Sequence, residues 1–270
     1  MNYIYSIYKT IKFLYWKTVP KSNNWVKVKS WRHATEISTG YDNNIILQKC
    51  LTSLLKVKNG DAVYERDSVL FDKIQYSWTL LAFLLKVSLE KDGCLSLIDF
   101  GGSLGSSYFQ NKEFLSDIKV LDWNIVEQEI FVKTGNEYFK NKELKFYNTI
   151  QEILELKNPN LIILSGVLQY LEKPLELLNE LNTSGIKYLI FDRTSFIENS
   201  NSIITIQKVN RSIYNESYPT WFFSENFIPD ALYNYDLITS FNSYCDPNYF
   251  INFKQCNWKG FVYKIKNKSV

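Results

Sequence analysis

Short apolar runs alternate with amphipathic stretches through the middle of this chain. Runs typical of buried strands occupy residues 95–98, 122–127, 144–149, 161–164 and 187–191. Helical patterns lie between them, at residues 128–136, at 151–157 and from Pro174, where a first helical turn accepts proline, to Gly185. Strands that alternate with helices at this interval predict an α/β fold with a parallel sheet.

The two ends of the chain break this alternation. Residues 31–58 and 76–89 have helical spacing before the first strand, whereas residues 203–209, 236–241 and 261–265 are strand-like, the last two resembling an antiparallel pair. Residues 211–223 are crowded with aromatic side chains. We therefore expect a helical cap over residues 1–92 that does not fold independently. A sheet domain over 93–270 follows, with an aromatic insertion at about 194–234, after the fifth strand.

A glycine-rich loop follows the first predicted strand. Residues 95–107 read LSLIDFGGSLGSS, so that Asp99 ends the apolar run and Gly101, Gly102, Ser103 and Gly105 follow. Glycine lets the backbone approach a ligand closely, and free N–H groups at a helix start suit a polar or anionic group. The acid can hold a cationic amino group. In doubly wound sheets, ligands bind at this end of the strands.

The loop admits four interpretations. A dinucleotide site requires glycine where Ser103 and Ser106 stand, which disfavours NAD. A hydrolase nucleophile elbow requires a histidine later in the chain, but the only histidine is His33. The acid-x-Gly-x-Gly-x-Gly loop of proteins that bind S-adenosylmethionine fits Asp99 and the glycines, with Ser103 at the middle glycine. The fourth interpretation is a plain strand–turn–helix without a ligand.

A second acid, Glu127, ends the next predicted strand about twenty residues after the loop. A carboxylate at this position accepts hydrogen bonds from ribose hydroxyls, so Glu127 supports a nucleoside site without choosing the cofactor. The alternative is an ordinary exposed carboxylate. Gln128 follows it, and the small residues Ser165 and Gly166 end the fourth strand, where they leave room for a ligand.

Composition excludes several classes of function. The chain has 270 residues, 46% of them hydrophobic, and a net charge of +3, which is too small to indicate a nucleic-acid partner. Its four cysteines show no close pairing, which argues against a zinc site or a disulfide framework and favours a reducing cytoplasm. No histidine or carboxylate cluster has metal-ligand spacing, and no apolar run reaches the length of a membrane span.

Residues 1–20 are rich in aromatic, isoleucine and lysine residues and lack a small-residue cleavage site. One interpretation is a basic amphipathic helix that contacts a membrane surface. The other is a helix that packs on the domain itself or on a second subunit of a homodimer.

Seven segments, taken together, resemble a family of class I S-adenosylmethionine-dependent methyltransferases encoded among bacterial capsule and O-antigen genes. They include YERDSVLF, LIDFGGSLGSSYFQ and ILSGVLQYLEKP, and they span residues 31–46, 64–71, 97–110, 123–128, 163–174, 191–196 and 217–224. The resemblance implies a Rossmann-like fold with a mostly parallel seven-stranded sheet and helices on both faces. It also implies S-adenosylmethionine as cofactor and, through gene setting alone, a saccharide acceptor.

Methyl transfer to a sugar hydroxyl benefits from a general base. Four residues are candidates: His33, Glu65, Asp67 and Asp192. His33 has an unperturbed pKa near neutrality, but a lone histidine is commonly structural. Glu65 and Asp67 are equally explained as an ion-pair cluster in the cap, and Asp192 as a helix cap or an acceptor anchor.

The acceptor side is expected near the last two parallel strands. Gln169 and Tyr170 follow the fourth strand, and Arg193, at the tip of the fifth, can bind a phosphate or carboxylate of the substrate. Tyr218 and Trp221 belong to the aromatic segment, whose rings suit stacking on a sugar; a hydrophobic lid or a dimer contact is the alternative.

The sequence therefore predicts an enzyme that methylates an oxygen on a saccharide, a sugar-linked substituent or a sugar-nucleotide precursor. A catalytically inert S-adenosylmethionine-binding scaffold in a glycan-assembly complex is the alternative from another class. A NAD-linked sugar oxidoreductase is weaker, because the third glycine and a Tyr-x-x-x-Lys pair are missing.

Overall fold

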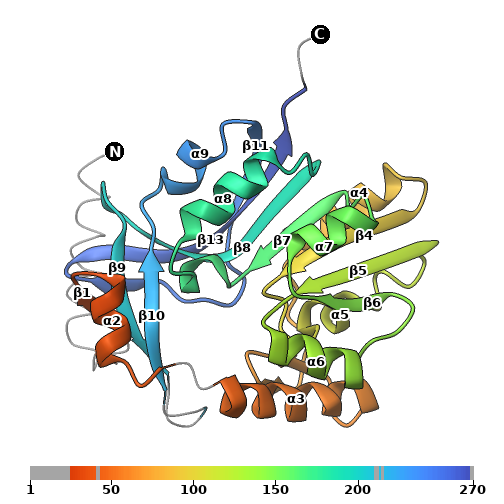
Figure 1. The fold of residues 1–270 in the computed structure, drawn as a ribbon, viewed down its shortest axis with the longest axis horizontal. Helices are drawn as coiled ribbons and strands as arrows, with labels where there is room; N and C mark the ends of the chain where they lie inside the picture. The colour runs from red at the N-terminus through yellow and green to blue at the C-terminus, as the bar shows by residue number, and fades with distance from the viewer. Residues whose placement is uncertain (1–24, 41–42, 210–212, 214–215, 268–270) are drawn as a thin grey trace.

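A central sheet organises the part of the chain that the computed structural model describes, which is residues 25–40, 43–209, 213 and 216–267. Its strands follow the order β11-β13-β8-β7-β4-β5-β6, with β12 paired to β13 outside this path (Figure 1). The parallel strands are β4 (Cys94–Phe100), β5 (Val120–Val126), β6 (Leu144–Tyr147), β7 (Leu161–Ser165) and β8 (Tyr188–Ile197). The antiparallel strands are β11 (Tyr235–Asn242), β12 (Tyr249–Ile251) and β13 (Lys254–Ile265). The predicted fold class, with a reversed last strand, is confirmed.

Helices cover both faces of this sheet. One apolar core joins it to α3 (Asn43–Asn59), α4 (Trp78–Leu89), α5 (Ser106–Asn111) and α6 (Glu129–Tyr138), and a second joins it to α7 (Ile150–Leu156), α8 (Pro174–Thr183) and α9 (Phe227–Ala231). Because successive side chains of a strand point to opposite faces, Leu161 and Ile163 enter the first core, whereas Ile162 and Leu164 enter the second. This two-sided burial explains why β7 is apolar throughout.

The segment before the sheet is less helical than the sequence suggests. The predicted helix over 31–58 is divided into α2 (Trp31–Ile37) and α3, because Gly40 adopts a positive φ of 93° and bridges to Ser217. Strands β2 (Tyr64–Arg66) and β3 (Val69–Phe71) form a hairpin. The expected helix at residues 1–20 lies outside the described residues.

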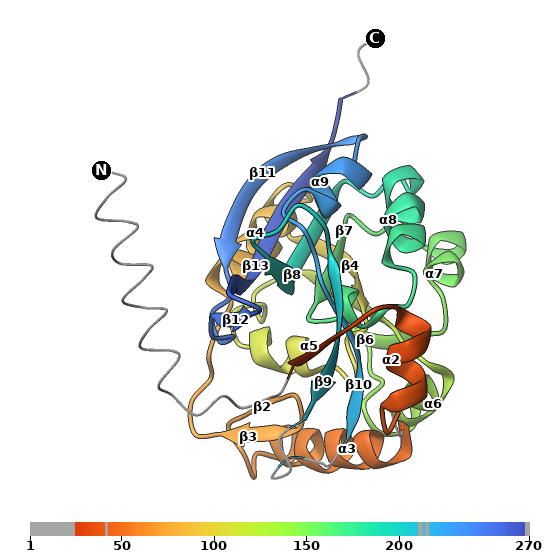
Figure 2. The same ribbon diagram turned by 90° about the vertical axis from the view of Figure 1, so that its left-hand side faces the viewer.

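A second sheet combines the start of the described chain with the insertion. Strand β1 (Trp25–Val28) pairs antiparallel with β9 (Ile203–Lys208), which also pairs with β10 (Ser217–Phe222). Figure 2 shows β9 and β10 side by side with α2 next to them. The short helical turn η1 (Leu168–Tyr170) packs against β10. The insertion therefore supplies two strands, and β1 the third, of a separate layer beside the carboxyl end of the main sheet.

Strand β8 is longer than predicted. The sequence places Asp192 and Arg193 at the strand tip, but β8 continues to Ile197 because β13 pairs with it beyond the end of β7. Arg193 has a positive φ of 52°, and the register between β8 and β13 shifts at this point. The two residues thus lie at an irregularity within the strand, where the parallel part of the sheet ends.

Within the described ranges, no helix is long and apolar enough to cross a membrane. The same ranges contain no group of histidine, cysteine and acidic side chains arranged to hold a metal ion. Cys50, Cys94, Cys245 and Cys256 are all free thiols.

We predict that Asp122→Asn lowers the free energy of unfolding by about 2–3 kcal/mol at pH 7. The Asp122 carboxylate accepts from Lys145 at 2.6 Å and Lys157 at 2.8 Å, joining β5 to β6 and to the end of α7. Although partial burial opposes ionisation, these ammonium groups hold the pKa of Asp122 well below its usual range. Its contribution is therefore present above pH 4 and is lost as the pH falls.

Urea denaturation at pH 7 and at pH 3 tests this prediction, with the exposed Asp117→Asn as control. An Asp122→Asn protein as stable as the wild type at pH 7 would contradict it.

Candidate functional site

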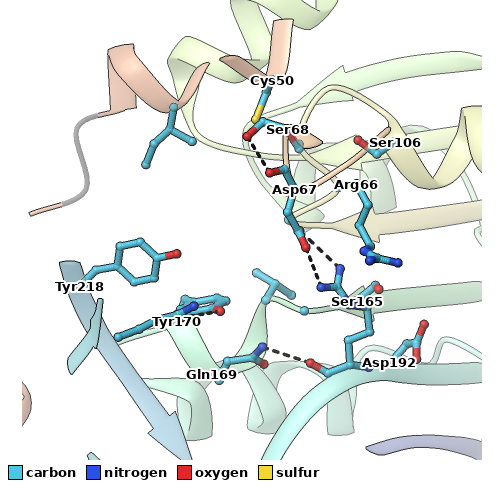
Figure 3. A pocket seen from close by; sticks show the side chains of 18 of the residues that line it. Cys50, Arg66, Asp67, Ser68, Ser106, Ser165, Gln169, Tyr170, Asp192 and Tyr218 are labelled. Carbon is cyan, nitrogen blue, oxygen red and sulfur yellow. Dashed lines mark hydrogen bonds and ion pairs between the residues drawn. The ribbon is translucent and has the colours of Figure 1, made fainter. Parts of the chain in front are cut away.

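A cleft of about 1030 Å³ opens at the carboxyl ends of the parallel strands. It lies where the strand order reverses, with β5 on one side of β4 and β7 on the other, which is the usual ligand position in such sheets. The sequence-predicted residues that line it are Glu65, Asp67, Asp99, Gly101, Gly102, Ser103, Glu127, Gln128, Ser165, Gly166, Gln169, Tyr170, Asp192, Arg193 and Tyr218 (Figure 3).

Three predicted site residues do not line this cleft. His33 is exposed on α2. A Cβ on Gly105 would meet the buried Leu144 at 3.1 Å, so this glycine serves the packing of the loop. The indole of Trp221 stacks on Trp31 and donates to the Leu171 carbonyl, which makes it part of the wall behind the cleft.

Two glycines of the loop sit where no side chain fits. A Cβ on Gly101 would lie 2.4 Å from Val167, and one on Gly102 would lie 2.6 Å from the Asp99 carboxyl group. Gly101 also has a positive φ of 71°. These positions therefore require glycine, and the exposed backbone beside them is available to a ligand.

Ser103 occupies the position of the middle glycine in a conformation that glycine favours. Its φ is 53°, in the left-handed region, and its backbone N–H donates to the Glu127 carboxylate at 3.1 Å. The other Glu127 oxygen accepts the Gln128 N–H at 2.9 Å. Each carboxylate oxygen keeps a further lone pair, so Glu127 can accept two ligand hydroxyls while it holds the loop.

Asp99 is almost completely buried, with 1% of its surface exposed, and accepts a hydrogen bond from the Trp123 indole at 3.0 Å. Burial raises the pKa of Asp99 to about 7, and Glu127 adds to this effect. Burial also raises the pKa of Glu127. No described cation forms an ion pair with either acid, so a cationic ligand group would stabilise both as anions.

The β2–β3 hairpin brings Glu65 into the same cleft. Its carboxylate accepts from the Ser68 N–H and from the Ser106 hydroxyl at the start of α5. Burial raises the pKa of Glu65 to about 7, although these two hydrogen bonds act to lower it. A carboxyl group with such a pKa exchanges its proton near neutral pH.

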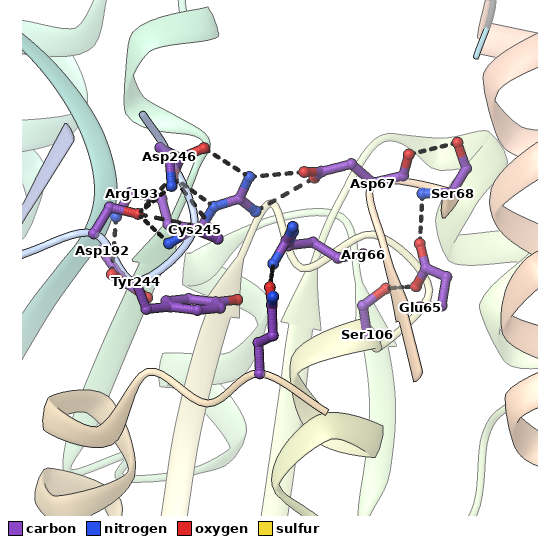
Figure 4. A network of polar contacts seen from close by, with 12 residues as sticks. Glu65, Arg66, Asp67, Ser68, Ser106, Asp192, Arg193, Tyr244, Cys245 and Asp246 are labelled. Atoms are coloured by element: carbon purple, nitrogen blue, oxygen red, sulfur yellow. Dashed lines mark hydrogen bonds and ion pairs between the residues drawn. The ribbon is translucent and has the colours of Figure 1, made fainter. Parts of the chain in front are cut away.

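Arg193, which the sequence suggests as a ligand for a substrate anion, forms ion pairs within the protein. Its guanidinium donates to Asp67 at 2.7 Å and to Asp246 at 3.0 Å (Figure 4). Burial acts to raise the pKa of Asp246, but the charge and hydrogen bond of Arg193 lower it below its usual value. The ion pairs tie the hairpin, β8 and the loop before β12 together across one side of the cleft.

Sequence reasoning missed several lining residues. Trp25, Tyr244, Asp246, Tyr249 and Trp258 line the cleft from β1 and from the segment between β11 and the middle of β13. The only signal was the high aromatic content, since neither segment carries a recognisable motif.

Neither a family model nor a curated protein matches this sequence. Among solved structures, the chain is similar to an S-adenosylmethionine-dependent methyltransferase from Clostridium acetobutylicum, with 10% identity, coverage of 69% of this chain and 91% of that one, and a TM-score of 0.43. It is also similar to the N-terminal domain of EvdMO1 in the presence of SAH and D-fucose, with 10% identity, coverage of 84% of this chain and 98% of that one, and a TM-score of 0.46. A third similar structure is that of CalS10 with bound SAM, an amino pentose methyltransferase from Micromonospora echinaspora. It has 8% identity, coverage of 71% of this chain and 92% of that one, and a TM-score of 0.43. These likenesses are distant, so the site's geometry has to support any functional assignment.

We predict that Gly101→Ala is more destabilising than Gly185→Ala. The two glycines have nearly equal φ values of 71° and 75°, so both variants lose about 1–2 kcal/mol to backbone strain. Only Gly101→Ala adds the clash with Val167, worth about a further 1–3 kcal/mol. Chemical denaturation measures both losses.

The Gly101→Ala, Val167→Ala double variant is the control for this clash, since it should recover part of the additional loss. Equal losses in the two glycine variants would show that Gly101 has room for a side chain.

We also predict that Glu65→Gln is more stable than the wild type at pH 8 by about 1–3 kcal/mol, and that this difference disappears near pH 4. Because the folded pKa of Glu65 is raised, the native state binds more protons than the unfolded state between about pH 4 and 7. The wild type therefore loses stability as the pH rises through this window, and the glutamine does not. Thermal unfolding from pH 4 to 8 measures the effect, with the exposed Glu129→Gln as control. A Glu65→Gln variant that is less stable than the wild type at every pH would contradict this prediction.

Proposed function

We propose that this protein is an S-adenosylmethionine-dependent methyltransferase that methylates an oxygen of a saccharide or saccharide-linked group in surface-polysaccharide assembly. One observation carries the proposal: the glycine loop after β4 and the acid after β5 meet in one cleft at the reversal of strand order, joined by the Ser103–Glu127 hydrogen bond. The saccharide and its pathway rest on the family resemblance of the sequence.

The residues present fit S-adenosylmethionine. Glu127 has lone pairs for the ribose hydroxyls, and the glycines at 101 and 102 leave the backbone open. Asp99, which has no ion-pair partner among the described residues, suits a cationic amino group at the same edge. The cleft exceeds the size of most small-molecule pockets, so it has room for a cofactor and an acceptor together.

The cofactor, when bound, supplies a sulfonium methyl group that an acceptor nucleophile displaces in line. The protein's part is to align the acceptor and to exclude water. We assign proton removal from the acceptor hydroxyl to Glu65, since a base is most effective when its pKa lies near the working pH. Asp67 is less suited because Arg193 binds its carboxylate.

We further propose that the cap over residues 1–92 and the insertion at about 194–234 form the acceptor side. The β2–β3 hairpin and Tyr218 of β10 line the cleft from these two segments. The proposal places the protein in the cytoplasm, where a reducing environment keeps its cysteines unpaired.

We predict that calorimetric titration detects binding of S-adenosylmethionine and of S-adenosylhomocysteine, and that Glu127→Gln weakens both by about tenfold or more. The substitution removes the charged acceptor for the ribose hydroxyls, and charged hydrogen bonds contribute enough for this loss. Glu129→Gln, two residues away and exposed, is the matched control and should bind normally.

Absence of binding in the folded wild type would refute the proposal. Binding of NAD in place of both adenosyl ligands would indicate an oxidoreductase.

A further inference from the structure

Two buried polar side chains, Asp192 and Gln169, line the acceptor side of the cleft, and both contact the backbone of Arg193. Asp192 is 1% exposed, and its carboxylate accepts hydrogen bonds from the Arg193 N–H and from the Ser77 side chain. The charge of Arg193 stabilises it, but the ion pairs of that guanidinium among the described residues go to Asp67 and Asp246. Gln169 is 2% exposed, and its side-chain oxygen Oε1 has no hydrogen-bond partner in the described part of the chain. The backbone of Arg193 contacts both, because its N–H donates to Asp192 at 2.9 Å and its carbonyl accepts from Gln169 at 3.1 Å. Figure 3 shows Gln169 and Asp192 on this side of the cleft.

The charge around this pair is negative. Arg193 is the guanidinium beside it, and its charge is shared by Asp67 and Asp246. With Asp192, three carboxylates therefore face one guanidinium. The other cation among the described lining residues is Arg66, which donates to a glutamine outside this group and stacks over an aromatic ring.

A positively charged N–H donor would satisfy both groups. Burial of a carboxylate is costly when it must share one counter-charge with two other carboxylates, and burial of a carbonyl oxygen without a donor is also costly. The rings of Tyr170 and Tyr218 lie edge to face, 5.4 Å apart, next to Gln169, and aromatic faces also attract cations. An anionic group would instead add to the repulsion among three carboxylates.

We propose that Asp192 and Gln169 bind a protonated amine of the acceptor, so that the acceptor is an amino-bearing saccharide and not a phosphorylated or nucleotide-activated one. The proposal rests on the proposed function of the cleft. It reverses the sequence-based role of Arg193, which here positions Asp192 and Gln169 through its backbone and binds no substrate anion.

The test compares three sugars that differ at one substituent: D-glucosamine, D-glucose and D-glucose 6-phosphate. Each is titrated into the full-length protein saturated with S-adenosylhomocysteine, whose own binding is measured first. D-Glucosamine should bind at least about tenfold more tightly than D-glucose, and D-glucose 6-phosphate more weakly than either.

Asp192→Asn should lower the ratio of D-glucosamine affinity to D-glucose affinity to about one, and the exposed Asp117→Asn should leave this ratio at its wild-type value. If Asp192→Asn does not fold, Gln169→Met is the second variant and should also reduce the preference for D-glucosamine. The comparison of the three sugars on the wild-type protein tests the proposal without any variant.

Equal binding of D-glucosamine and D-glucose, tighter binding of the phosphate, or no binding of any sugar would overturn the proposal. So would displacement of D-glucosamine by S-adenosylhomocysteine, because the cation site would then belong to the amino group of the cofactor. If S-adenosylhomocysteine itself does not bind, the proposed function fails, and the amine preference of the free protein then decides this inference alone.

Discussion

The hydrogen bond from the Ser103 N–H to the Glu127 carboxylate links the two halves of the candidate cofactor site. It holds a non-glycine residue in the left-handed conformation that the loop requires. It also fixes the carboxylate at the end of β5 against the loop that follows β4. The loop, the start of α5 and the first helical turn of α6 are thereby positioned around one opening.

A second group of charges holds one side of the cleft together. Arg193 lies where β8 leaves the parallel sheet, and its ion pairs reach the β2–β3 hairpin through Asp67 and the loop before β12 through Asp246. Segments far apart in the sequence are thus brought together by one buried guanidinium. Because Asp67, Asp246 and Asp192 surround the single guanidinium of Arg193, this side of the cleft carries a negative charge that the sequence did not indicate.

The sequence was informative where structure depends on local patterns. Apolar runs ending at Asp99, Glu127 and Ser165 located the parallel strands and the edge of the sheet at which the cleft opens. The three-stranded sheet was missed because β1 pairs with β9 across most of the chain, and no local pattern encodes that partner. The ion pair between Arg193 and Asp246 was missed for the same reason, since Asp246 is distant in sequence and only the fold brings it near.

The crystal structure of the complex with S-adenosylhomocysteine tests the central claim most directly. The account predicts that both ribose hydroxyls lie within hydrogen-bond distance of Glu127 and that the backbone at Gly101 and Gly102 contacts the ligand. A ligand bound elsewhere, or one whose ribose does not contact Glu127, would contradict the account.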